Sequence, residues 1–112
     1  MTHQVQELLL EDGSSPYADW FNALPIDVAI KITVAKVRMQ QGNLSNVFWF
    51  RGIGEYKINH GAGWRIYLAR DGLQIIILLG GGSKRTQQRD IEHAITLWSS
   101  YKTRKSKKTK KQ

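Results

Sequence analysis

Four polar residues on two adjacent segments of the chain could together bind a phosphate group. Side chains alternate between the two faces of a strand, so Glu55 and Lys57 share one face of the first segment. By the same rule, Arg65 and Tyr67 share one face of the second. The tight turn His60-Gly61-Ala62-Gly63 joins the segments, and we expect them to pair with all four side chains on one exposed face. Cations beside an aromatic ring suit phosphate binding and base stacking, the combination used in single-stranded RNA binding.

Further cations lie close to these strands in the sequence. Lys84 and Arg85 follow an apolar strand, Arg89 lies in the first turn of the predicted last helix, and Arg51 precedes the first segment. With Lys57, the cations Arg51, Arg85 and Arg89 are candidates for binding RNA phosphates. An alternative stays open, because a Glu and an Arg on adjacent strands often form only a solvated cross-strand ion pair.

Other kinds of chemistry have no support in the sequence. The chain has no Cys and only three His, which are far apart and lack a carboxylate at metal-ligand spacing. We therefore expect neither a metal site nor a thiol nucleophile. There is no Gly-x-Ser-x-Gly motif for acyl transfer. The run Gly80-Gly81-Gly82 lacks the spacing of a phosphate-binding loop or a dinucleotide fingerprint, so we expect a turn there and no small-molecule cofactor.

The order of the expected elements predicts one α+β domain. Ser15-Pro16 is a typical helix start, with a hydroxyl N-cap before Pro at the first helical position. Asp71-Gly72 is a typical hairpin turn. Segregated helices and hairpin-linked strands indicate a mainly antiparallel sheet of four to five strands, with two N-terminal helices and one C-terminal helix. In chain order, we expect a strand at 3–10, helices at 15–24 and 25–42, strands at 47–50, 55–59, 64–69 and 73–79, and a helix at 86–101.

The predicted second helix has more apolar residues than one buried face requires. It could be wedged between the sheet and the first helix, which is the interpretation that we favour, or it could keep part of its surface for a partner protein. One apolar row consists of Ile26, Ala29, Ile30, Val34 and Val37, and the other of Val28, Ile32, Ala35 and Met39.

Charge divides the chain into a nearly neutral domain and a basic tail. Seven of the 17 Lys and Arg follow Tyr101, and the rest of the chain carries ten of them against nine Asp and Glu. We expect a domain at residues 1–101 and a tail at residues 102–112, which is disordered unless the last helix extends into it. The tail either adds salt-sensitive affinity for ribosomal RNA or serves only solubility.

No segment has the features of a secretion signal or a membrane span. The longest apolar run covers residues 75–79, far short of the roughly 20 residues that cross a bilayer. We therefore expect a cytoplasmic protein without a membrane partner.

Two longer stretches carry a resemblance to a known family. Residues 54–67 read Gly-Glu-Tyr-Lys-Ile-Asn-His-Gly-Ala-Gly-Trp-Arg-Ile-Tyr, and residues 78–94 read Leu-Leu-Gly-Gly-Gly-Ser-Lys-Arg-Thr-Gln-Gln-Arg-Asp-Ile-Glu-His-Ala. They resemble the motifs of phage-derived addiction-module killer proteins, in the RelE/ParE/HigB toxin superfamily. There the first motif commonly reads Glu-Leu-Arg-Ile, a Gly-x-Gly turn and aromatic-Arg-Val-Tyr. The second reads Gly-Gly-Asp-Lys-Ser-Thr-Gln, then Asp-Ile-x-x-Ala. The resemblance covers roughly residues 3–101.

The resemblance implies a RelE-like fold and the toxin of a type II toxin–antitoxin system, held silent by a cognate antitoxin protein. Many relatives are mRNA interferases, endoribonucleases that cut ribosome-associated mRNA by attack of the RNA 2′-OH on the adjacent phosphodiester. On this interpretation Arg65 and Lys84 stabilise the phosphate, with support from Lys57. Tyr67 stacks on or positions a base. Glu55 is either the general base or only holds Arg65.

Two departures from the family motifs keep other functions open. Lys57 stands where Arg is common, which replaces a bidentate phosphate contact by a point charge, and Ser83 replaces a usual Asp. ParE-like members inhibit DNA gyrase without nuclease activity, and a decayed toxin could persist as an RNA-binding module. The joint presence of Arg65, Lys84 and Tyr67 favours the nuclease, with mRNA and the ribosome as partners.

Overall fold

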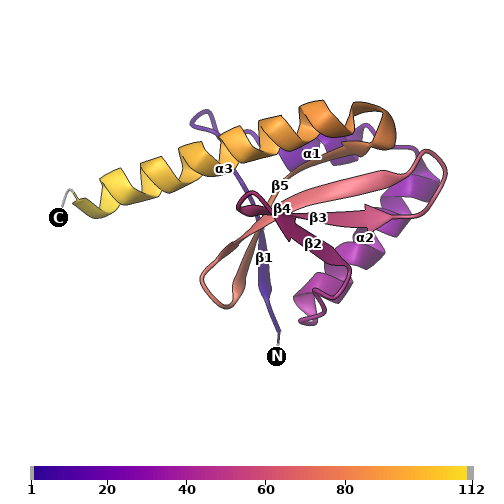
Figure 1. Cartoon of the computed structure of the whole chain (residues 1–112), viewed down its shortest axis with the longest axis horizontal. Helices are drawn as coiled ribbons and strands as arrows, with labels where there is room; N and C mark the ends of the chain where they lie inside the picture. Colours follow the sequence, from indigo (N-terminus) through magenta and orange to yellow (C-terminus); the bar gives the residue numbers. More distant parts are fainter. Residues whose placement is uncertain (1, 111–112) are drawn as a thin grey trace.

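The computed structural model describes residues 2–110 and has three layers, with helices on both faces of one five-stranded sheet (Figure 1). Helices α1 and α2 pack on one face of the sheet, and α3 packs on the other. In chain order the elements are β1 (Gln4–Glu7), α1 (Pro16–Asn22), α2 (Ile26–Gln40), β2 (Val47–Phe50), β3 (Ile53–Ile58), β4 (Trp64–Asp71), β5 (Ile75–Ser83), the 3₁₀ turn η1 (Lys84–Thr86) and α3 (Gln87–Lys110).

The helix boundaries follow from local capping chemistry. Pro16 is the first residue of α1, and the Ser15 hydroxyl accepts a hydrogen bond from the Ala18 backbone N–H at 3.0 Å, as the N-cap prediction requires. Helix α2 begins directly after Pro25 and ends shortly before Gly42, whose φ of 94° suits glycine.

The predicted fold is wrong about the sheet and about the first two helices. The strand order is β1-β5-β4-β3-β2, and β1 pairs in parallel with β5 while the other neighbours are antiparallel, so the sheet is mixed. Helices α1 and α2 do not form an N-terminal pair, because the chain starts with β1 and the two helices connect β1 to β2.

The burial of β5 gives the physical reason for this arrangement. Residues 76–79 of β5 are all buried, so an unpaired edge there would leave buried backbone groups without partners. Strand β4 occupies one edge of β5, and β1 occupies the other. After β1, the chain crosses one face of the sheet as helices α1 and α2. Strand β1 itself lies at the edge of the sheet, parallel to β5.

Helix α3 is longer than the predicted last helix. It runs for 24 residues to Lys110. It therefore extends into the segment from Lys102, which we expected to be disordered unless the last helix continued into it. The last two residues of the predicted tail, 111 and 112, lie outside the described residues. Within residues 2–110, no helix is long and apolar enough to cross a membrane.

Candidate functional site

A buried ion pair lies beneath the start of α3. The Nε atom of Arg65 in β4 is 3.7 Å from Oε2 of Glu55 in β3, and the two residues are only 4% and 7% exposed. Gln87 Nε2 donates to the same Glu55 oxygen at 2.9 Å, and Arg65 Nη1 donates to the Gly63 carbonyl at 2.7 Å. These contacts hold both side chains in one orientation. They also offset part of the free-energy cost of burying two charges.

The Gly63 carbonyl connects the buried arginine to Lys84. It also accepts a hydrogen bond from the Lys84 backbone N–H at 2.8 Å. Gly63 has a φ of +75°, and a Cβ atom there would lie 3.4 Å from Arg65 Nη1 and 3.6 Å from Lys84 Cβ. The β3–β4 turn therefore brings the backbone of the exposed residue Lys84 to the same carbonyl that the buried guanidinium contacts.

A second carboxylate, Asp90, belongs to this group although sequence reasoning gave it no role. Its Oδ2 atom accepts a hydrogen bond from Thr86 Oγ1 at 2.5 Å, and the side chain is 15% exposed. Asp90 lies over Gly82, which pairs with Arg65 in the neighbouring strand, and a Cβ atom at Gly82 would collide with the carboxylate. A glycine inside a strand often marks such a close approach, and this was the signal that could have identified Asp90.

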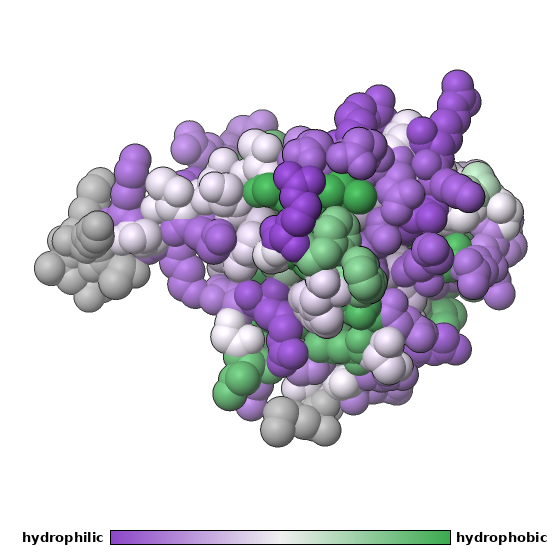
Figure 2. Space-filling view, viewed as in Figure 1, coloured by the Kyte–Doolittle hydropathy of each residue, from purple (hydrophilic) through white to green (hydrophobic). Residues whose placement is uncertain are grey.

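We call Glu55, Arg65, Gln87 and Asp90 the buried cluster. Four exposed cations lie around it: Lys57, which pairs with Arg65 across β3 and β4, and Lys84, Arg85 and Arg89 at the start of α3. They form what we call the cationic rim. Hydrophilic side chains gather over this end of the molecule, at the upper right of Figure 2. Arg89 makes only a long contact with Asp90, 3.8 Å between Nε and Oδ1.

The predicted exposed face is wrong, although the predicted pairing is confirmed. The register pairs Glu55 with Tyr67 and Lys57 with Arg65, which places all four side chains on one face of the sheet. Helix α3 covers that face, so Glu55, Arg65 and Tyr67 are buried and only Lys57 is exposed. Strand alternation shows which side chains share a face, but it does not show which face a distant helix covers.

Tyr67 is part of the core rather than a base-stacking platform. It is 1% exposed and packs in the apolar cluster beneath α3. In the described part of the chain its hydroxyl has no hydrogen-bond partner. Burial, followed by the negative charge of Glu55, raises the pKa of this hydroxyl well above its usual value. Stacking on an RNA base would require an exposed ring, so the structure does not support that predicted role.

Arg51 does not join the other candidate residues. It occupies the β2–β3 turn with a φ of 51°, and its guanidinium donates to both carboxylate oxygens of Glu92 in α3, at 2.7 and 3.2 Å. The hydrogen bonds from Arg51 hold the pKa of Glu92 below its usual value. This ion pair attaches the β2–β3 turn to α3.

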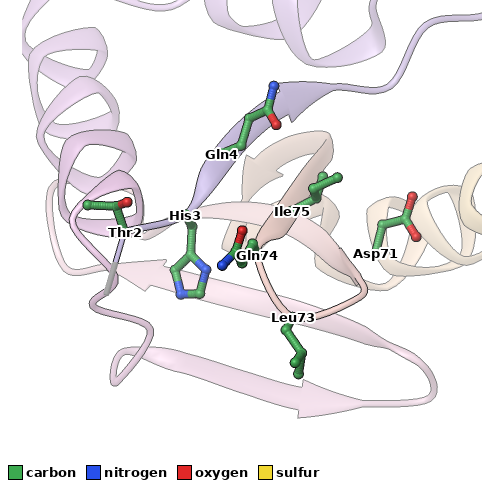
Figure 3. A pocket seen from close by; sticks show the side chains of 7 residues that line it. All are labelled: Thr2, His3, Gln4, Asp71, Leu73, Gln74 and Ile75. Atoms are coloured by element: carbon green, nitrogen blue, oxygen red, sulfur yellow. The ribbon is translucent and has the colours of Figure 1, made fainter.

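The pocket of Figure 3 lies away from the buried cluster, at the end of the sheet formed by β1 and the β4–β5 turn. Asp71, which among the described residues is the one carboxylate lining this pocket, already accepts hydrogen bonds from Tyr101 at 2.9 Å and Lys105 at 2.6 Å. Across residues 2–110, no three His, Asp or Glu side chains gather as a metal-binding group would. The lining residues are Thr2, His3, Gln4, Asp71, Leu73, Gln74 and Ile75.

A comparison with known proteins found a relative that aligns with most of the chain. The chain is 34% identical over 96 residues to a protein of Haemophilus influenzae (strain ATCC 51907 / DSM 11121 / KW20 / Rd) described as an uncharacterized protein. The alignment covers 84% of this chain and 91% of the relative. No family model matches the chain.

Proposed function

The chain belongs to the same family as the uncharacterized Haemophilus influenzae protein, and we propose that it is the toxin of a type II toxin–antitoxin system. Its activity is that of an mRNA interferase, an endoribonuclease that cuts ribosome-associated mRNA. The sequence resemblance to addiction-module killer proteins supports the toxin, and the arrangement of charged side chains supports the nuclease.

The observation that carries the proposal is the buried ion pair of Glu55 and Arg65 next to the cationic rim. A buried ion pair contributes little to stability compared with apolar side chains of similar volume, so its presence in a small domain needs another explanation. It sits where four exposed cations gather, and Lys and Arg side chains bind the phosphate oxygens of nucleic acids.

The geometry supports a specific distribution of roles. Lys84 is exposed and contacts the scissile phosphate, where it stabilises the negative charge that develops on the phosphoryl oxygens. Arg65 positions Lys84 through the Gly63 carbonyl that both residues share. Asp90 is the more accessible carboxylate, at 15% against 8% side-chain exposure for Glu55, and takes the proton of the 2′-OH.

The proposed reaction transfers the phosphate from the 5′-oxygen to the 2′-oxygen of the preceding nucleotide. The 2′-oxygen attacks phosphorus as Asp90 removes its proton, and the bond from phosphorus to the 5′-oxygen breaks. The leaving 5′-oxygen takes a proton from solvent water, and Asp90 returns the proton of the 2′-OH to the solvent. The products are a 2′,3′-cyclic phosphate and a 5′-hydroxyl end. Ligation-based mapping therefore detects the new 5′ ends only after they have been phosphorylated.

The experiment is induced expression in a bacterial host, followed by mapping of mRNA 5′ ends. We expect growth arrest with new cuts inside translated messages for the wild type, and cleavage reduced by about 10²- to 10³-fold in Lys84→Gln and Arg65→Ala. Lys36→Gln and Arg70→Ala are matched controls elsewhere on the molecule, and both should cut normally. Lys84→Gln is the decisive variant, because its exposed side chain can be replaced without loss of the fold.

Three outcomes would overturn the nuclease proposal. Unchanged cuts in Lys84→Gln would remove the buried cluster and cationic rim as the site. Growth arrest without cuts would point to a gyrase inhibitor of the ParE type. The absence of any arrest would point to a decayed RNA-binding module.

The proposed antitoxin has a suitable surface on α2. The row of Ile26, Ile30, Val34 and Val37 is 42–81% exposed, whereas the second row, Val28, Ile32, Ala35 and Met39, is buried against the sheet. The favoured prediction, a helix wedged between the sheet and α1, is therefore wrong for the first row. An exposed apolar row of this kind is typical of a protein-binding surface.

A groove between α2 and β3 adds charge to this surface. Apolar Ile30, Val34 and Ile58 line it, and so do the basic residues Lys31 and Arg38, with no carboxylate among its lining residues in the described chain. An antitoxin segment with an apolar face and acidic flanks complements this groove.

A further inference from the structure

The last part of α3 forms an arm that leaves the rest of the molecule. Tyr101 is the last residue of the helix that packs in the apolar cluster beneath α3, and the helix continues to Lys110. Figure 1 shows these final turns extending beyond the sheet, on the side away from α2. We call residues 102–110 the arm.

The charge of the arm is entirely positive. The described side chains include Lys102, Arg104, Lys105 and Lys107, and the sequence adds Lys108 and Lys110. The chain has no Asp or Glu after Glu92 and no apolar residue after Tyr101. Like charges three or four residues apart repel one another along a helix, and a polyanion bound to the arm would relieve that repulsion.

Two contacts hold the base of the arm in a fixed direction. Lys105 Nζ donates to Asp71 Oδ2 at 2.6 Å, from the end of β4, and Arg104 Nη2 donates to the Leu9 carbonyl at 3.0 Å, from the β1–α1 connection. The Lys105 and Tyr101 hydrogen bonds hold the pKa of Asp71 below its usual value. The cations are thus presented on a helix anchored at its base, which lowers the entropy lost on binding.

We propose that the arm is a second nucleic-acid contact, separate from the buried cluster, which binds the phosphate backbone of double-helical RNA without reading its sequence. The choice of RNA rests on the proposed function. A helix that inserts into a membrane surface needs an apolar face, and single-stranded binding relies on aromatic stacking. The arm has neither, whereas rows of Lys and Arg are sufficient for duplex phosphates.

The length of α3 separates the two contacts. At 1.5 Å per residue, Lys102 lies about 22 Å along the helix from Gln87, where α3 meets the buried cluster. The two contacts are therefore far enough apart to bind different parts of one folded RNA. Docking by the arm and cleavage at the cluster are therefore separable by mutation.

The test measures binding of the full chain to a labelled RNA duplex of about 20 base pairs by fluorescence anisotropy between 50 and 200 mM salt. We expect Lys102→Gln/Lys107→Gln to lower the slope of log affinity against log salt by about two, close to 0.9 for each lost phosphate contact. The matched control Lys31→Gln/Lys36→Gln, with the same charge change on α2, should keep the wild-type slope.

Several results would overturn the proposal. One is an equal slope of log affinity against log salt for the arm variant and the wild type. Another is a loss of slope in the α2 control as large as that in the arm variant. A third is tighter binding of the wild type to a single strand than to the duplex of the same length. Arm-dependent binding to vesicles with anionic lipid, without binding to the duplex, would assign the arm to a membrane surface. If the wild type binds the duplex through the arm but makes no cuts in the host, the nuclease proposal is overturned and the arm proposal stands.

Discussion

At the scale of single residues, two glycines determine how closely the charged groups approach one another. Gly63 offers one carbonyl to both the Arg65 side chain and the Lys84 backbone. Gly82 leaves the space that the Asp90 carboxylate occupies. A methyl group at Gly82 would collide with Asp90, whereas a Cβ atom at Gly63 would lie at ordinary contact distances and would be strained only by the positive φ.

We predict that Gly82→Ala destabilises the protein by about 1–3 kcal/mol, the usual cost of overpacking, because the new methyl group collides with Asp90. In an Asp90→Ala background the same change should cost clearly less, since the colliding carboxylate is absent. Urea denaturation of the four proteins measures this coupling. An equal cost in both backgrounds would show that Asp90 does not occupy the space over Gly82.

At the scale of elements, α2 has two apolar faces with different surroundings. The face with Ile32 and Met39 is completely buried in the core, whereas Ile26 is 81% exposed on the opposite side. The exposed row of α2 borders the groove between α2 and β3, which basic side chains line. The groove favours a helical ligand with acidic flanks, and this preference can be measured before the natural partner is known.

We predict that a helical peptide of about 20 residues, with leucines on one face and flanking glutamates, binds this groove. Val34→Asp should weaken binding at least about tenfold, or 1.4 kcal/mol, because it places a carboxylate on the apolar floor. Leu73→Asp makes the same change at an exposed leucine in the β4–β5 turn and serves as the control. Calorimetric titration distinguishes the two, and equally tight binding of a lysine-flanked peptide would contradict the charge argument.

At the scale of the whole molecule, the sheet separates two apolar cores, and each contains a buried tyrosine. Tyr17 packs with α2 on one face, and Tyr67 packs with α3 on the other. Burial, followed by the charge of Glu7, raises the pKa of Tyr17 to about 12. Burial raises the pKa of Tyr67 as well.

These tyrosines make stability sensitive to alkaline pH. A tyrosine with a raised pKa in the folded state contributes stability that is present below its unfolded pKa, near 10, and is lost as pH rises toward the folded value. We predict that the free energy of unfolding falls between pH 10 and about 12, by up to about 1.4 kcal/mol per pH unit for each tyrosine. Denaturation in urea across this range measures the slope. Tyr17→Phe should flatten it, and an unchanged slope would contradict this account.

Local interactions could be predicted from the sequence because they act over a few residues. The Ser15 cap on α1, the start of α2 after Pro25 and the pairing of the strands that carry Glu55 and Tyr67 all follow from hydrogen bonding and alternation within short segments. The sequence therefore determined which helices and strands form, and which candidate side chains share one face of the sheet.

The tertiary structure alone decided what covers each face. It placed α3 over Glu55, Arg65 and Tyr67, brought Asp90 over Gly82, set β1 parallel to β5, and left one row of α2 exposed. These features depend on contacts between segments that are far apart in the chain. Periodicity within one segment records that it has an apolar face, but which partner buries that face is settled only when the layers of the whole domain pack together.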